Sequence, residues 1–182
     1  MASFLRSTLT TRAVRSFSTT PRLCDRAVVY SQNGDPETVL SVLTYPNLPT
    51  PPPPNSVNIR LLLAPINPAD INVVQGVYPS KPTKTDALAP SGKGSEDEAV
   101  FVGGNEGLAE VTSVGQGVQT IREGDWVILT KQQAGTWATD RNVSTVDVLR
   151  VPDGKAIGPV RAATLTVGII ASHRLLRVLI LL

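Results

Sequence analysis

The stretch "VFVGGNEGLAEVTSVGQGVQTIREGDWVILT", residues 100–130, carries the strongest secondary-structure signal in the chain. Apolar and polar residues alternate through "AEVTSV", which is typical of a strand with one buried face. "GQG" then predicts a turn, and "IREGDWVIL" predicts a second turn followed by a strand. Glycines at these junctions permit a positive φ or a close backbone approach. The stretch therefore predicts antiparallel β structure.

The segment before it, "SVNIRLLLAPINPADI" (56–71), predicts another strand that ends at Pro68. The proline ring fixes φ and holds Asn67 extended. Asp70 is expected to cap a short helix over "DINVVQG", and Gly76 is expected to end it. The strand and the helix are thus predicted to meet at a sharp corner.

The flanking segments complete a mainly β pattern. "RAVVYSQNGDPETVLSVLTY" (26–45) holds two β-like runs around a turn, and "GTWATDRNVSTVDVLRVP" (135–152) adds short strands. "PTPPPPNS" (49–56) predicts an exposed polyproline-II link, because prolines cannot join a central sheet ladder. Residues 83–99 are polar and predict a long surface loop. Strands and turns at this spacing predict one compact β barrel or sandwich.

Composition excludes several classes of site. The chain of 182 residues has one cysteine, Cys24, and one histidine, His173. Cys24 alone rules out an internal disulfide, and the pair lies too far apart in the sequence to predict a zinc site. A nucleophile activated by histidine would have to use His173, which lies in an apolar tail. We therefore expect neither a metal centre nor a catalytic triad.

The two ends differ from the rest. Residues 1–24 contain four arginines, many Ser and Thr and no acid, which predicts a mitochondrial presequence and the matrix as compartment; a disordered basic tail is the alternative. The remaining chain has 13 basic against 15 acidic residues, so it offers no basic patch for nucleic acid. Residues 168–182 form an apolar tail that is short for a membrane span. We expect an exposed terminal helix or strand, with a membrane anchor as the alternative.

"VNIRLLLAPINPADINVVQGVYP", "VGGNEGLAEVTSVGQGVQTIREGDWVI" and "GTWATDRNV" together resemble the mitochondrial trans-2-enoyl-thioester reductases, also called enoyl-acyl-carrier-protein reductases. These belong to the medium-chain dehydrogenase/reductase superfamily. The resemblance covers residues 25–167 and implies a GroES-like β-barrel catalytic domain. In zinc-dependent members a histidine occupies the position of Asn105. The family continues into a Rossmann domain, which the resemblance implies is missing here; residues 168–182 depart from the family pattern, as a readthrough, frameshift or mis-spliced end would.

The resemblance also implies a reaction and its residues. Reduction of a 2-enoyl thioester needs hydride at the β carbon and a proton at the α carbon. A tyrosine, with an ordinary pKa of about 10, keeps its proton until an enolate demands it. By resemblance Tyr78, in the loop "GVYPS", is the proton donor, and Asn67 and Trp137 are candidates for the substrate cleft. Capping or turn formation is the alternative role for Asn67, and core packing is the alternative for Trp137.

The implied cofactor is NADPH, although no cofactor-binding or metal-binding residue is identified in this chain. The implied partner is an acyl thioester on acyl carrier protein or coenzyme A, not nucleic acid, and the full-length family is expected to form homodimers. The chain by itself is expected to be inactive. Alternatives are a non-catalytic GroES-like fragment or interaction module, and a zinc-independent protein related to quinone reductases.

Overall fold

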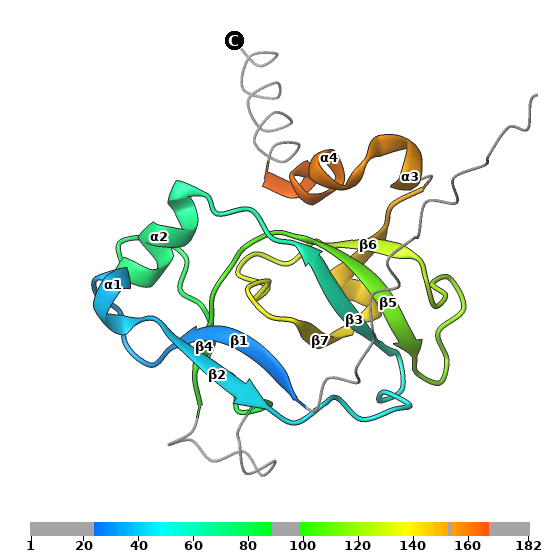
Figure 1. Cartoon of the computed structure of the whole chain (residues 1–182), viewed down its shortest axis with the longest axis horizontal. Coiled ribbons are helices and arrows are strands. Elements are labelled where there is room, and N and C mark those ends of the chain that lie inside the picture. Colours follow the sequence, from blue (N-terminus) through cyan, green and yellow to red (C-terminus); the bar gives the residue numbers. More distant parts are fainter. Residues whose placement is uncertain (1–23, 89–98, 153, 168–182) are drawn as a thin grey trace, which may run out of the picture.

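The computed structural model describes residues 24–88, 99–152 and 154–167. In this part of the chain two antiparallel sheets lie side by side. One pair of helices, 36–39 and 68–75, lies beside the smaller sheet, and a second pair, 154–157 and 159–163, lies over an end of the larger one (Figure 1). The predicted mainly β class is therefore confirmed.

The smaller sheet has the order β2–β1–β4. Its strands are β1 (Asp25–Tyr30), β2 (Ser41–Tyr45) and β4 (Phe101–Val102). The short helix α1 (Pro36–Val39) connects β1 to β2, and the side chain of Asp35 caps it by accepting the N–H of Glu37 at 3.1 Å. The sheet pairs the start of the described chain with a strand about 70 residues further along, which local sequence patterns do not reveal.

The larger sheet has the order β7–β3–β5–β6–β8. Its strands are β3 (Ser56–Leu63), β5 (Leu108–Val114), β6 (Trp126–Leu129), β7 (Asp140–Ser144) and β8 (Val148–Arg150), with a 3-10 turn, η2 (Thr145–Asp147), between the last two. Burial alternates along most of β5, as the sequence predicts. The predicted strands on both sides of the glycine turns are therefore confirmed.

Aliphatic side chains fill the interior of both sheets. The core of the larger sheet is built around Val57, Ile59, Val111 and Val127, each at most 1% exposed. Burying each such side chain fully stabilises the fold by about 1.5–3 kcal/mol. The smaller sheet has its own core, to which Leu88 contributes from the loop before β4. The predicted surface loop is thus anchored at this residue; residues 89–98 lie outside the described part.

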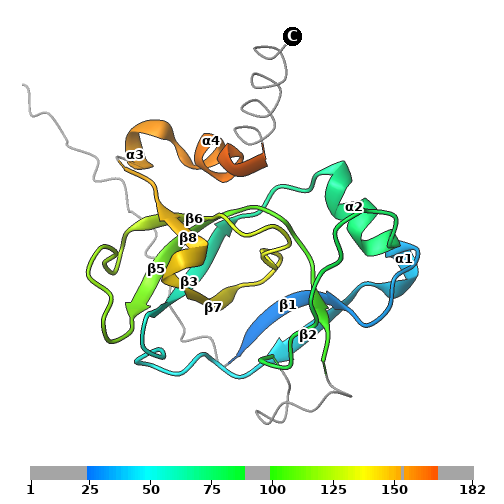
Figure 2. The same cartoon turned by 180° about the vertical axis from the view of Figure 1, so that it is seen from behind.

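The other three helices follow strands of the larger sheet. Helix α2 (Pro68–Gln75) follows β3, while α3 (Gly154–Ile157) and α4 (Pro159–Ala163) follow β8. Ala162 and Ala163 of α4 pack with Leu108 and Ile128 of the larger sheet. Seen from behind, α4 again lies over the end of this sheet (Figure 2).

The proline segment is mostly exposed, as predicted. Pro51, Pro53 and Pro54 are exposed, whereas Pro52 is buried. A Cβ at Gly115 would collide with the carbonyl oxygen of Pro53, so the segment packs closely on the turn after β5. The exposed link is therefore also anchored to the domain, which the sequence did not indicate.

The predictions for the two ends concern residues 1–23 and 168–182, which lie outside the described part. Among the described residues, no helix has the length and apolar character of a membrane span. In the same residues, no three His, Cys, Asp or Glu side chains gather as metal ligands.

Candidate active site

Tyr78 lies directly after α2, where the backbone is held in several places. Gly76 adopts a left-handed conformation with φ +79°, which ends the helix as predicted. The N–H groups of Val77 and Tyr78 both donate to the carbonyl of Asn72, at 3.0 and 3.1 Å. The chain therefore folds back over the last helical turn, and the half-buried side chain of Tyr78 leaves from a fixed backbone.

Three side chains hold the same loop, and two of them, Asn33 and Gln133, are distant in the sequence. Asn33 donates to the carbonyls at the end of α2, Val73 and Val74, at 3.0 and 3.1 Å. Lys81 donates to the carbonyl of Gly76 at 2.8 Å. The amide of Gln133 donates to the carbonyl of Ser80, also at 2.8 Å. Sequence reasoning missed these residues because Asn33 and Gln133 reach the loop only through the tertiary fold.

Asp70 helps to cap the helix as predicted, but it does so from the third helical position as part of a capping box. It sits three residues inside the helix, and Asn67 occupies the capping position with the expected extended backbone. Oδ2 of Asp70 accepts the N–H of Asn67 at 2.6 Å. Oδ1 accepts two bonds from Asn105, one from the backbone N–H at 2.8 Å and one from the side-chain amide at 2.7 Å. Because Asp70 is 2% exposed, these three bonds satisfy a carboxylate removed from water.

Asn105 links this carboxylate to the far side of the site. Its amide nitrogen donates to Asp70, and its amide oxygen accepts the backbone N–H of Gln133 at 3.0 Å. An amide supplies a donor and an acceptor at once, so no proton has to be lost or gained. Asn105 therefore acts here as a structural connector between α2 and the loop after β6.

Glu106 connects Asn67 to the end of the described chain. One carboxylate oxygen accepts the side-chain amide of Asn67 at 3.0 Å, and the other accepts the backbone N–H of Val167 at 2.9 Å. Glu106 is 2% exposed. Asn67 precedes α2 and Tyr78 follows it, and an eight-residue helix is about 12 Å long. Hydrogen bonds from distant residues thus surround α2, and they hold Asn67 at the N-terminus of this helix.

Trp137 lies on the glycine pair of "VGGNEG". A Cβ at Gly103 would collide with the indole ring, and one at Gly104 would collide with Oγ1 of Thr136 and stand 2.6 Å from Cδ1 of Trp137. Gly104 also has φ +94°, which disfavours other residues. Both glycines are therefore required for a flat ring to approach the backbone.

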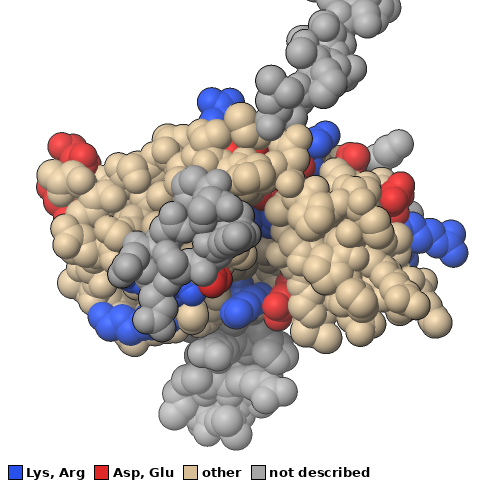
Figure 3. Space-filling view, turned by 90° about the horizontal axis from the view of Figure 1, so that it is seen from below, with Lys and Arg blue, Asp and Glu red and all other residues tan. Residues whose placement is uncertain are grey.

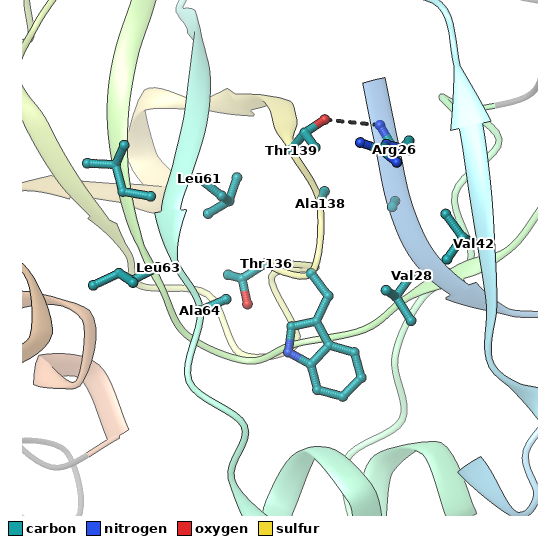
Figure 4. Close-up of a pocket in the computed structure, with 12 residues that line it drawn as sticks. Arg26, Val28, Val42, Leu61, Leu63, Ala64, Thr136, Ala138 and Thr139 are labelled. Atoms are coloured by element: carbon teal, nitrogen blue, oxygen red, sulfur yellow. Dashed lines mark hydrogen bonds between the residues drawn. The ribbon is translucent and has the colours of Figure 1, made fainter. Parts of the chain in front are cut away.

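A cavity of about 400 Å³ opens beside Trp137. Arg26 and Val28 of β1 face Leu61 and Leu63 of β3 across it, and the N–H of Arg26 donates to Thr139 (Figure 4). Neither Tyr78 nor Asn67 is among its lining residues. The structure therefore does not place the predicted cleft residue Trp137 and the predicted acid Tyr78 around this same cavity.

Two polar atoms next to this cavity have no partner. The indole N–H of Trp137 and Oγ1 of Thr136 are buried and make no hydrogen bond within the described residues. An unpaired buried polar group costs about 1–3 kcal/mol. Within the described residues, the barrel therefore leaves two buried polar groups beside this cavity without a hydrogen bond.

The three tyrosines separate clearly by environment. Tyr30 and Tyr45 are each 2% exposed, and burial raises the pKa of both hydroxyls, that of Tyr45 to about 12. The Tyr45 hydroxyl donates to the carbonyl of Asp140. Tyr78 is the half-buried tyrosine of the described chain. It is therefore the one whose hydroxyl a substrate could meet.

Charge is spread rather than gathered. On the face seen in Figure 3, basic and acidic side chains occur together on a surface that is mostly uncharged. Asp25, at the start of β1, is 5% exposed and hydrogen-bonds to Asp140. Burial, and then the neighbouring charge of Asp140, raise the pKa of Asp25. Arg60 lies 3.2 Å from Asp140 on its other side.

Two antiparallel sheets, a helix that follows β3 and a double-glycine loop packed against an indole are the features of a mainly β, GroES-like domain. The sequence agrees with this class over most of its length. The chain belongs to the alcohol dehydrogenase GroES-like domain family, whose sequence pattern matches residues 53–173. The predicted GroES-like fold is thereby confirmed.

Its relatives include mitochondrial enoyl-acyl-carrier-protein reductases. The one from Schizosaccharomyces pombe is 39% identical over 168 residues, which are 91% of this chain and 43% of that protein. The Etr1p/Etr2p heterodimer of mitochondrial 2-enoyl thioester reductase from Candida tropicalis matches with 38% identity and a TM-score of 0.68, over 78% of this chain and 40% of the other. The Etr1p complex with NADP and crotonyl-CoA matches with 36% identity and a TM-score of 0.70, over the same shares. The chain thus spans less than half the length of these relatives.

Proposed function

We propose that this chain is the catalytic barrel of an NADPH-dependent enoyl-thioester reductase, with Tyr78 as the proton donor. The relative solved with NADP and crotonyl-CoA supports the reaction class. The described residues hold two antiparallel sheets and no parallel nucleotide-binding fold. We therefore assign NADPH binding to a second domain that works together with the barrel.

The environment of Tyr78 is the observation that carries the assignment of the acid. Tyr30 and Tyr45 are closed inside the core, whereas Tyr78 is half-buried on a loop whose backbone is fixed. A general acid must reach its substrate and must be held in place. Among the tyrosines of the chain, Tyr78 meets both conditions.

The proposed step is a proton transfer at the α carbon of the substrate. NADPH, if bound by the second domain, would supply hydride to the β carbon, and the electron pair of the double bond would move toward the thioester carbonyl. The hydroxyl of Tyr78 then donates its proton to the α carbon and regains one from water. A fixed loop favours this step because it holds the hydroxyl in one orientation.

We also propose the setting of the reaction. The substrate is an acyl thioester carried by coenzyme A or by acyl carrier protein. The working form is a homodimer in the mitochondrial matrix; the relatives named as mitochondrial and the solved heterodimer support this setting.

The test is a chimaera in which residues 25–167 replace the matching segment of the Schizosaccharomyces pombe relative. Oxidation of NADPH should depend on added crotonyl-CoA, and the 182-residue chain alone should show none. A folded chimaera that binds NADPH but reduces no enoyl thioester would refute the proposal.

A non-catalytic interaction module is the second candidate. Ile66 and Val77, on the two sides of α2, are 71% and 70% exposed, and Val160 of α4 is 69% exposed. Exposed apolar residues of this size favour contact with another surface. This reading predicts an inactive chimaera, and turnover in that chimaera would exclude it.

A further inference from the structure

A second cavity, of about 450 Å³, borders the loop that follows Tyr78. Its walls come from residues 80–85, from the loop after β6 and from β7. Unlike the cavity beside Trp137, it is lined mainly by polar groups, with hydroxyls and amides around its basic residues. Its volume falls in the usual range for small-molecule sites.

The charge of the lining is strongly unequal. Lys81, Lys84, Lys131 and Arg141 border the cavity, and Asp147 is the one carboxylate among the lining residues. No ion pair joins these four basic side chains to an acid within the described residues. The described lining of this cavity therefore carries more positive than negative charge, which favours an anionic ligand.

Arg141 is the most informative of the four. It is half-buried, and its Nη1 donates to the carbonyl of Gly135 at 3.1 Å. Burial lowers the pKa of its guanidinium, and the charged form of Tyr45 acts in the opposite direction. A guanidinium presents five N–H donors, and in the described part of the chain one carbonyl accepts from them. A partly buried charge of this kind is stabilised when an anion approaches it.

Two of the lysines are already oriented. Lys81 donates to the carbonyl of Gly76 at 2.8 Å, and the ammonium of Lys84 lies 5.4 Å from the ring centre of Phe101. An ammonium has three donors, so each keeps donors for a ligand. Contacts that fix long side chains reduce the entropy lost on binding.

We propose that the cavity bordered by Lys81, Lys84, Lys131 and Arg141 binds a phosphate ester of nucleotide size. Phosphate suits it because guanidinium and ammonium groups both donate to phosphate oxygens. The cavity is larger than a lone phosphate needs, and its hydroxyls and amides suit the sugar and amide groups of such a ligand. The proposal does not depend on the reductase activity, because the lining excludes Tyr78.

The test uses titration calorimetry of the 182-residue chain at low salt with 3′,5′-ADP as the probe. Adenosine measures the part of the affinity that needs no phosphate, and inorganic phosphate measures the part that needs no nucleoside. Coenzyme A, dephospho-coenzyme A and NADPH then separate the possible sources of the phosphate. We expect 3′,5′-ADP to bind and adenosine not to bind, with an affinity that falls as salt rises.

The double variant Lys84→Gln/Lys131→Gln removes two charges from exposed positions while keeping side-chain length. It should weaken 3′,5′-ADP binding at least about tenfold, because hydrogen bonds to charged groups are the strong ones. Arg122→Gln removes an exposed charge outside the cavity and should leave binding unchanged. Thermal unfolding of all three proteins checks that the fold is kept.

The outcomes are decisive. Failure of every phosphate compound to bind, or equal binding by the double variant, overturns the proposal. Inorganic phosphate that binds as tightly as 3′,5′-ADP overturns the assignment to a ligand of nucleotide size. If calorimetry detects no binding, the reductase proposal is unaffected, because that proposal is tested by turnover of the chimaera.

Discussion

Replacing Gly104 by alanine should destabilise the domain through two separable effects. With φ +94°, the position resembles the left-handed region, where a Cβ costs about 1–2 kcal/mol. The new Cβ would also collide with Oγ1 of Thr136 and stand 2.6 Å from Cδ1 of Trp137, and such overpacking costs about 1–3 kcal/mol. Alanine also reduces the conformational entropy of the unfolded chain, which offsets about 0.4–1 kcal/mol of this destabilisation. The free energy of unfolding should therefore fall by about 1–5 kcal/mol.

Gly124→Ala is the matched control. Gly124 has a similar φ of +83°, but nothing lies within 4 Å of the added Cβ. It should lose only the backbone contribution, about 1 kcal/mol. Urea unfolding of the two variants, followed by circular dichroism, measures both values. If Gly104→Ala costs no more than Gly124→Ala, the close packing of Trp137 on the glycine pair is wrong.

Asp70→Asn should lower the free energy of unfolding by about 2–4 kcal/mol, because an amide cannot accept all three N–H bonds now made to the buried carboxylate. The control Asp125→Asn, at a half-buried turn with one such bond, should lower it by less than about 1 kcal/mol. Equal losses for the two variants in urea unfolding would contradict the connecting role of Asp70. Asp25→Asn should stabilise the domain at pH 7. The raised pKa of Asp25 means that the folded state binds more protons than the unfolded state, so its contribution to stability is lost as pH rises from about 3.8 through the folded pKa. Thermal unfolding between pH 4 and 7 should show a flatter profile for the variant, and a destabilised variant at pH 7 would be the opposite result.

The strands and the helix end could be predicted because each depends on local chemistry. Alternation fixed the expectation for β5, and Gly76 ends α2 because the left-handed conformation there favours glycine. Asn67 is extended because Pro68 follows it. These rules need only neighbouring residues, so one sequence suffices.

The remaining features depend on contacts between distant segments. Asp70 caps the helix as expected, but it also accepts N–H groups from Asn105, 35 residues away, which the sequence did not indicate. Pro52 is buried because the turn after β5 comes back over its segment. Arg141 was not a candidate from the sequence, because a single arginine in a strand carries no signal until the cavity around it is known. The tertiary fold supplies these partners, and local periodicity does not.

The most direct measurement compares kcat of two variants of the chimaera, each of which lacks one tyrosine hydroxyl. Tyr78→Phe should lower kcat with crotonyl-CoA by about a hundredfold or more, as expected for loss of a general acid. Tyr30→Phe makes the same change in the core, at a residue 2% exposed, and should leave kcat within about threefold of the parent. Full turnover in Tyr78→Phe would contradict the central claim that this phenol supplies the proton.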